Sequence, residues 1–240
     1  MKTRPHWAGE LVVVAFLLVI YDQVASLAST RATAAFTHGR DLLALSPWDL
    51  ERAADHWLAG VSWLRAPASL YYDLAHINVT FVVLVACFWW RGEVYRRART
   101  ALVLVNLTGL IVFLLYPVAP PRLLPGAGFV DIVGLSGTWQ SGGASVQHSN
   151  AYGSMPSLHA AWAIWVALTV ASMTTRPWLR ALAYLHVVVT FVVVVVTGNH
   201  YVIDIFAGAL TIGLAWAVAP LVALGSQVPH RVSAGVVEPG

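Results

Sequence analysis

Six strongly apolar stretches divide the chain, and polar or glycine- and proline-rich segments separate them. They cover 9–28, 68–90, 100–118, 158–174, 179–198 and 201–224. A helix needs about 20 mostly apolar residues to cross a bilayer, and only the fourth stretch is clearly short. Because backbone polar groups in lipid must find partners within their own segment, each stretch is predicted to be a helix. The pattern therefore predicts an all-α, polytopic membrane protein built as a six-transmembrane-helix bundle.

The first apolar stretch allows two interpretations. Lys2 and Arg4 precede it and small residues follow it, which is also the pattern of a cleaved secretory signal. We favour an uncleaved first span, because the later stretches make the chain polytopic in any case. Whether this segment is removed stays open.

Two long segments between the spans differ in character. In 29–67, charged residues mix with tryptophans, and apolar residues recur at helical spacing from 48 to 64. Ser46 followed by Pro47 is typical of a helix start, so we expect an amphipathic interfacial helix between the first two spans. The segment 117–157 is rich in proline and glycine, and long irregular connections of this kind are often functional.

These features predict four parts of the chain. They are an N-terminal segment with the first span (1–28), an extracytoplasmic interfacial segment (29–67), a catalytic membrane bundle (68–224) and a flexible C-terminal tail (225–240).

Composition agrees with a bilayer environment, since 58% of the residues are hydrophobic and only 10% are charged. Mean hydropathy is +0.70. The net charge of +3 does not indicate nucleic-acid binding, because no run of Lys and Arg alternates with aromatic residues. With the N-terminus in the cytoplasm, nine of the 14 Lys and Arg residues fall on the inner side. The positive-inside rule then predicts a plasma-membrane protein with both termini cytoplasmic and both long segments extracytoplasmic.

Ionisable residues at the ends of spans are costly in a membrane and are therefore functional candidates. His159 begins the fourth span, and His200 and Asp204 lie four residues apart at the start of the sixth. Arg122 follows the third span, so the topology places all of these residues at the outer face. A histidine nitrogen can attack phosphorus while a carboxylate orients the ring, a second histidine serves as acid and base, and an arginine holds the phosphoryl oxygens.

The expected roles follow from that chemistry. We assign His200 as nucleophile, Asp204 as its orienting partner and His159 as the general acid and base. The expected phosphate ligands are Arg122, Ser157, Asn150 and Tyr152. Asp131, in the loop, is expected to be solvated.

At these residues the sequence resembles the type-2 phosphatidic acid phosphatase superfamily, in particular its inositol phosphorylceramide synthase-like (inositolphosphotransferase) branch. The matching motifs are Pro-Ser-Leu-His at 156–159, His-Tyr-x-x-Asp at 200–204 and, in part, Ala-Pro-Pro-Arg at 119–122. Two basic positions of the parent motifs are replaced, by Leu115 and Val194. The resemblance implies six spans, no metal or other cofactor, and a site facing away from the cytoplasm.

The resemblance also implies a substrate and further site residues. The expected substrate is a lipid phosphate in the outer leaflet, cleaved through a phospho-histidine intermediate by a phosphatase or a phosphotransferase. The branch tends to carry a tyrosine and a histidine early in a span, as Tyr72 and His76 stand here, and His76 and Tyr201 are possible substrate contacts. The missing cations favour a phosphodiester, and therefore head-group transfer, as the alternative to hydrolysis.

Two other classes of function remain as alternatives. One is a non-enzymatic transporter or scaffold that uses its charged residues as an ion path. The other is a metal-dependent hydrolase with the His and Asp residues as ligands. The sequence leaves the head group, lipid tail, acceptor and oligomeric state open.

Overall fold

The computed structural model describes residues 6–46, 49–136 and 150–225. Within these ranges the regular structure is helical, apart from an isolated bridge between Val118 and Gly153. The elements are α1 (Trp7–Ser29), α2 (Ala32–Ala44), α3 (Leu50–Gly60), α4 (Ser62–Trp90), α5 (Gly92–Leu115), η1 (Pro121–Leu123), α6 (Ile132–Leu135), α8 (Leu158–Met173), α9 (Pro177–Val196) and α10 (Val202–Gly225).

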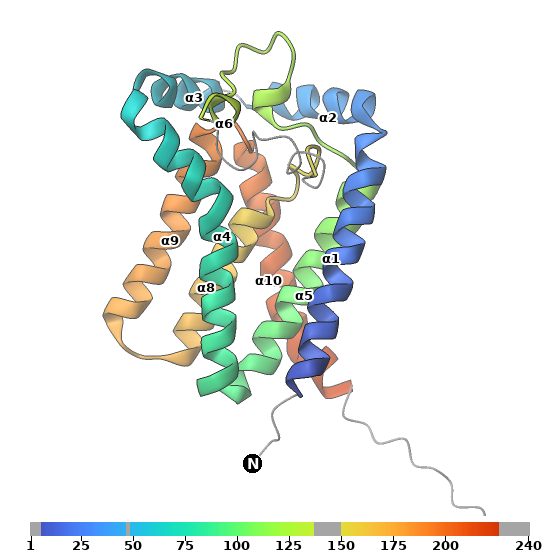
Figure 1. The fold of residues 1–240 in the computed structure, drawn as a ribbon, viewed down its shortest axis with the longest axis vertical. Helices are drawn as coiled ribbons and strands as arrows, with labels where there is room; N and C mark the ends of the chain where they lie inside the picture. The colour runs from blue at the N-terminus through green and yellow to red at the C-terminus, as the bar shows by residue number, and fades with distance from the viewer. Residues whose placement is uncertain (1–5, 47–48, 137–149, 226–240) are drawn as a thin grey trace, which may run out of the picture.

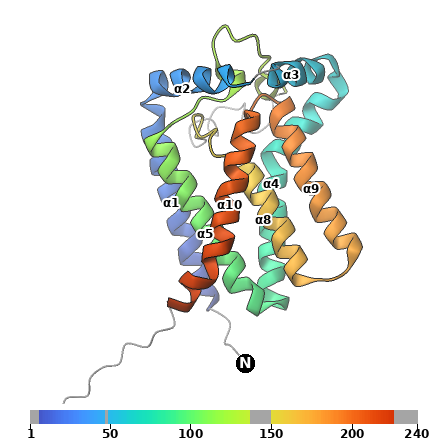
Figure 2. The same ribbon diagram turned by 180° about the vertical axis from the view of Figure 1, so that it is seen from behind.

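The long helices run roughly side by side and alternate in direction along the chain (Figures 1 and 2). Helix α8 lies in the middle and contacts α4, α5, α9 and α10, whereas α1 packs on α5. Helices α2 and α3 lie across the upper end in Figure 1, and the irregular segments after α5 and before α8 gather at the same end. The described chain begins and ends at the lower end.

Five helices are long and apolar enough to cross a membrane, namely α1, α4, α5, α9 and most of α10. The predicted all-helical, multi-pass membrane architecture is confirmed to that extent. Helix α8 is apolar but has only 16 residues, or about 24 Å at 1.5 Å per residue. The predicted ends need correction: α4 and α5 begin at Ser62 and Gly92, six and eight residues earlier than the apolar stretches indicated.

The single interfacial helix expected between the first two spans is replaced by α2 and α3, followed directly by α4. The expected start at Ser46 is also wrong, because α3 begins at Leu50 after Asp49, whose φ is 52°. The Ser46 hydroxyl donates instead to the Glu51 carboxylate. Pro47 lies outside the described residues.

Helix α3 turns its acids inward and part of its apolar surface outward. Glu51 and Asp55 are buried, while Leu50 and Trp57 are about half exposed. The Glu51 carboxylate accepts the backbone N–H of Val202, the first residue of α10. The Asp55 carboxylate accepts the N–H of Val130, in the segment after η1. Both acids therefore tie α3 to the elements beneath it.

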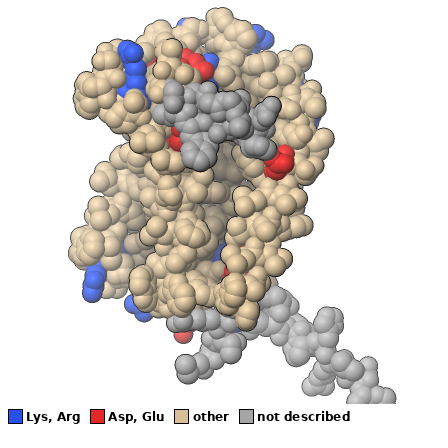
Figure 3. Space-filling view, in the orientation of Figure 1, with Lys and Arg blue, Asp and Glu red and all other residues tan. Residues whose placement is uncertain are grey.

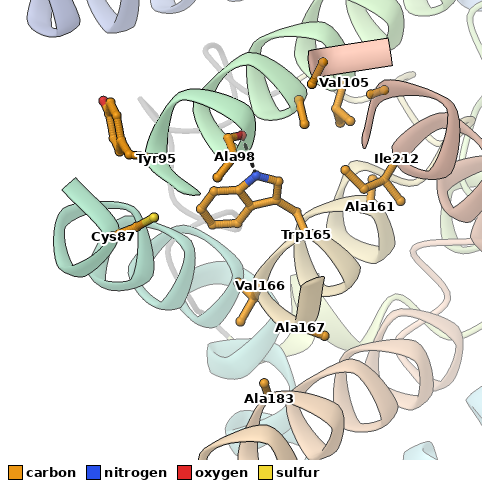
Figure 4. Packing of buried hydrophobic residues seen from close by; sticks show 13 residues of the cluster. Cys87, Tyr95, Ala98, Val105, Ala161, Trp165, Val166, Ala167, Ala183 and Ile212 are labelled. Atoms are coloured by element: carbon orange, nitrogen blue, oxygen red, sulfur yellow. Dashed lines mark hydrogen bonds between the residues drawn. The ribbon is translucent and has the colours of Figure 1, made fainter. Parts of the chain in front are cut away.

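The main core of the bundle is packed around Trp165 of α8, which is fully buried (Figure 4). Its indole N–H donates to the carbonyl of Ala98 in α5 at 2.7 Å. Ala98 and Ala161 line the same contact, and small residues of this kind let membrane helices approach closely. This packing sets α8 firmly between its neighbours and fixes the residue at its upper end, His159.

Candidate active site

Three irregular segments meet at the upper end of the bundle and form the frame of the site. The segment after α5 pairs with the segment before α8, where the N–H of Val118 donates to Tyr152 and the N–H of Ser154 donates to Val118. It also meets the α9–α10 turn, where the N–H of Arg122 donates to the carbonyl of Gly198 at 2.9 Å. The backbone thereby brings the three sequence motifs together.

The turn between α9 and α10 presents His200. Gly198 ends α9 with a φ of +63°, a conformation that an L side chain rarely adopts. A Cβ there would also lie 3.1 Å from Cβ of Arg122 and 3.2 Å from the Asp55 carboxylate. Beyond the glycine, the N–H of His200 returns to the carbonyl of Val194 at 3.0 Å. This sharp turn fixes the backbone position from which the His200 side chain extends.

The His200 imidazole is buried and held through one nitrogen. Its Nδ1 lies 2.9 Å from the carbonyl oxygen of Ser154 and 3.3 Å from the Asp204 carboxylate. Both neighbours are acceptors, so Nδ1 carries the proton and Nε2 keeps its lone pair. The same carboxylate oxygen of Asp204 accepts from the Ser154 hydroxyl and from the N–H of Tyr201. Asp204 therefore lies where it can orient the ring, and its role as the orienting partner remains a prediction.

His159 reaches the site from the start of α8. The Ser157 hydroxyl caps this helix by accepting the N–H of Ala160 at 3.2 Å. The N–H of Ser157 donates to the carbonyl of Asp204 at 3.0 Å, which joins the start of α8 to the first turn of α10. One turn further along α10, Gly208 passes so close that a Cβ would lie 2.4 Å from the Ser157 carbonyl oxygen.

The two histidines meet as a result of this docking. His159 Nδ1 lies 3.3 Å from His200 Nε2. Because His200 Nε2 is the acceptor, His159 donates from Nδ1. Its Nε2 is buried and has no hydrogen-bond partner among the described residues.

Helix α4 covers the outer side of the His159 ring. Tyr72 stacks on the ring at a centroid distance of 4.4 Å, and the His76 ring lies 4.0 Å away. Tyr72, His76 and His159 line a small pocket between α4 and α9. His76 therefore lies next to His159, and its contact with a substrate remains a prediction.

Arg122 contacts Asn199, the residue before His200, and is firmly positioned. Its Nε donates to the side chain of Asn199 at 2.8 Å, and its Nη1 pairs with Asp131 at 2.9 Å. The side chain is only 14% exposed. The guanidinium is thus a preorganised cation, but Asp131 offsets part of its charge.

Four of the other predicted site residues have different surroundings. Tyr201 is fully buried and its hydroxyl donates to the carbonyl of Ala119, so the ring leaves no surface for a substrate. The Ser157 hydroxyl is engaged as the helix cap. The Tyr152 ring packs edge-on against Phe36 of α2. The Asn150 side chain accepts the N–H of Tyr152, and within the described residues no contact of either one with His159 or His200 is found.

Sequence reasoning missed several residues that support the site. Ser154 and Asn199 stand next to the motifs but carry no pattern of their own. Asp131 was expected to be solvated, and its side chain is 42% exposed, but it also pairs with Arg122 and accepts the N–H of Gly134. Burial raises the pKa of the Asp55 carboxyl. Asp55 is connected to the site only through its position next to Gly198, which the structure alone reveals. For Glu51 and Asp55, the acids of α3, the available sequence signal was their four-residue spacing, which places both side chains on one face of a helix.

In the described part of the chain, no group of three or more His, Cys, Asp or Glu side chains is arranged to hold a metal ion. Independence from metals remains a prediction.

Comparison with known proteins gives the chain its family. The family model of the PAP2 superfamily matches residues 45–218, which include both histidines, Asp204 and Arg122. No curated protein and no solved structure matches significantly. The chain belongs to the PAP2 superfamily, whose members are phosphatases, and this supports a phosphatase-type enzyme acting on lipids.

Proposed function

We propose that this member of the PAP2 superfamily cleaves a lipid phosphate ester by transferring the phosphoryl group to His200. The observation that carries the proposal is the tautomer of His200. With Nδ1 held by Ser154 and Asp204, the lone pair of Nε2 points at His159 and becomes available as a nucleophile once the two rings separate.

The reaction balances with the groups present. Nε2 of His200 bonds to phosphorus as the bond from phosphorus to the lipid oxygen breaks, and His159, acting from its doubly protonated imidazolium form, gives a proton to that oxygen and becomes neutral. Asp204 stabilises the positive charge on the substituted imidazole. Water or an alcohol then attacks the phospho-histidine, and His159 takes the proton back. Water gives hydrolysis, and an alcohol gives transfer.

The charge of the site favours a phosphodiester as a second candidate substrate. Arg122 shares its charge with Asp131. The two positions where the parent motifs are basic carry Val194, buried in the pocket wall, and Leu115, which is 69% exposed and directed away from the bundle. A diester carries one negative charge fewer than a fully ionised monoester and needs fewer cations. Head-group transfer of the inositolphosphotransferase type fits this sparse site.

The proposed topology counts α8 as the sixth span. Helix α8 begins below the upper ends of α9 and α10 and ends at the lower end, and its packing against α4, α5, α9 and α10 supports counting it as a span despite its length. Arginines gather at the lower end, where Arg91, Arg96, Arg97, Arg99, Arg176 and Arg180 lie. This asymmetry supports cytoplasmic termini and a site at the extracytoplasmic face of the plasma membrane.

A substrate panel tests the proposal. The purified protein is offered phosphatidic acid, polyprenyl phosphate and diphosphate, and phosphatidylinositol, with and without an alcohol acceptor, and products are separated by thin-layer chromatography. We expect His200→Ala and His159→Ala to lose at least about a thousandfold in turnover, since nucleophile and acid act together. His56→Ala, at the same end but bonded to Gly128, is the matched control.

Three outcomes would contradict the proposal, and a fourth would separate transfer from hydrolysis. Full turnover by His200→Ala would exclude it as nucleophile. Activity lost in EDTA and restored by zinc would instead support the metal-dependent hydrolase. Product containing the alcohol would favour transfer over hydrolysis. Absence of any reaction across the panel, together with substrate flux in proteoliposomes, would favour the transporter.

A further inference from the structure

A second concave site lies at the end of the bundle opposite the histidines. It is an open pocket of about 520 Å³ beside the loop that joins α8 to α9. Its lining includes Arg91, Arg176 and Arg180, together with the hydroxyl residues Ser172, Thr174 and Thr175. Figure 3 shows basic side chains at the lower end of the molecule, as well as others at the upper end. The pocket belongs to the size range of ligand sites.

The three arginines differ in how they are held. Arg180 closes the last turn of α8, with Nε donating to the carbonyl of Thr174 at 2.9 Å and Nη2 donating to that of Ala171 at 2.8 Å. Arg91 and Arg176 are exposed, and no ion pair of either is found in the part of the chain that the structure describes. The pocket thus has one fixed cation and two cations free to close on a ligand.

The charge of the pocket is uncompensated. No Asp or Glu lines it. Glu93, the acid next to Arg91 along the chain, is exposed and forms no ion pair within the described ranges. Three cations with convergent hydroxyl groups and no acid suit a phosphate group, which accepts several charge-assisted hydrogen bonds.

The surroundings indicate a lipid as the source of that phosphate. Trp90, which precedes Arg91, is 75% exposed, and Trp178, close to Arg176 along the chain, is 56% exposed. Exposed tryptophans at the ends of spans mark the level of the lipid head groups. Basic pockets between transmembrane helices are typical sites for anionic head groups.

We propose that this pocket binds the phosphate head group of an anionic phospholipid from the leaflet opposite the histidines. Arg180 presents a fixed donor, and Arg91 and Arg176 close over the phosphate from the α4–α5 turn and from the start of α9. The lipid then links three helices through their lower ends. This binding is independent of the reaction proposed for His200.

Native mass spectrometry of the full chain in a neutral detergent tests the proposal, with short-chain phosphatidylglycerol as the probe in 0.15 M ammonium acetate. Each basic residue near a membrane surface contributes about a fivefold change in binding of anionic lipid. We therefore expect Arg91→Gln and Arg176→Gln each to weaken binding about fivefold. Phosphatidylcholine and inorganic phosphate serve as the neutral and lipid-free probes.

Arg96→Gln is the matched control, because Arg96 lies at the same end and carries the same charge but does not line the pocket. It should alter binding less than twofold. Binding of the lipid at the histidine end is common to all variants and cancels in this comparison. Equal losses in all three variants would show only a general charge effect and overturn the proposal. Inorganic phosphate binding as tightly as the lipid would refute the lipid source.

Discussion

Gly208 offers a sharp test of how the two histidines are brought together. It lies on α10 one turn after Asp204, and an alanine Cβ there would lie 2.4 Å from the Ser157 carbonyl oxygen. Ordinary contacts begin near 3.4 Å, so α8 and α10 must separate by about 1 Å at this point. The obstacle is backbone, which cannot rotate aside as a flexible side chain would.

The displacement acts directly on the catalytic geometry. Ser157 precedes His159 by two residues, and its N–H is bonded to the carbonyl of Asp204. Moving the start of α8 by about 1 Å therefore shifts His159 relative to His200, and misplacement of this size costs about a hundredfold in rate. Overpacking of this kind also destabilises by about 1–3 kcal/mol. We expect Gly208→Ala to lower kcat about a hundredfold with a smaller change in KM.

Gly213→Ala is the control, because a Cβ at Gly213, on the same helix, meets nothing within 4 Å. Its stability should stay within about 1 kcal/mol of the parent protein, the usual range for exposed helical glycines. The assay is turnover of whichever lipid phosphate the panel identifies, with thermal unfolding measured in the same detergent. If Gly208→Ala retains turnover and Tm equal to those of Gly213→Ala, the close approach of α8 and α10 does not position the histidines.

Three further predictions concern the surroundings of the site. Ser154→Ala removes a buried donor to Asp204. It should lower kcat about tenfold, because a hydrogen bond to a charged group contributes about 1.5–3 kcal/mol. Ser69→Ala is the control in the same assay. Tyr201→Phe leaves the Ala119 carbonyl without its donor. It should destabilise the folded protein by about 1–3 kcal/mol, measured by thermal unfolding, and leave KM unchanged. A raised KM would instead support Tyr201 as a substrate contact. Burial raises the pKa of Asp55, so the folded state binds the proton more tightly and stability falls as pH rises from about 4, the unfolded pKa, through the raised value. Asp55→Asn should flatten that decline in Tm, and an unchanged pH profile would contradict the assignment.

The spans were predictable because the bilayer leaves a long apolar segment one solution, the helix. The residues at which the spans begin were harder to predict, because the arginines at the beginning of α5 suggested a loop. The structure keeps them in the helix, because Arg97 donates to the carbonyl of Trp216 and Arg99 pairs with Glu10. Charged side chains that find partners on neighbouring helices do not end a helix.

The character of α3 could not be predicted from its amphipathic pattern alone. The pattern gives two faces but not the solvent that each one meets. Leu50 and Trp57 lie outward, whereas Glu51 and Asp55 lie inward on the same side as the buried Leu58, so the inner face mixes acids with an apolar side chain. The acids are stable there because each accepts a backbone N–H from another element, and such tertiary partners leave no trace in the local sequence.

The placement of His159 against His200 has a consequence for substrate binding that the motifs alone did not reveal. Their facing nitrogens are 3.3 Å apart, whereas a phosphorus atom in line for attack needs about 3–3.5 Å from its nucleophile alone. The rings must therefore separate before the reaction. His200 is held by Ser154 and Asp204 through buried hydrogen bonds to Nδ1, whereas the His159 ring stacks on Tyr72 of α4. We therefore expect His159 to be the ring that moves, and α4, which carries Tyr72 and His76, to limit how far it can go.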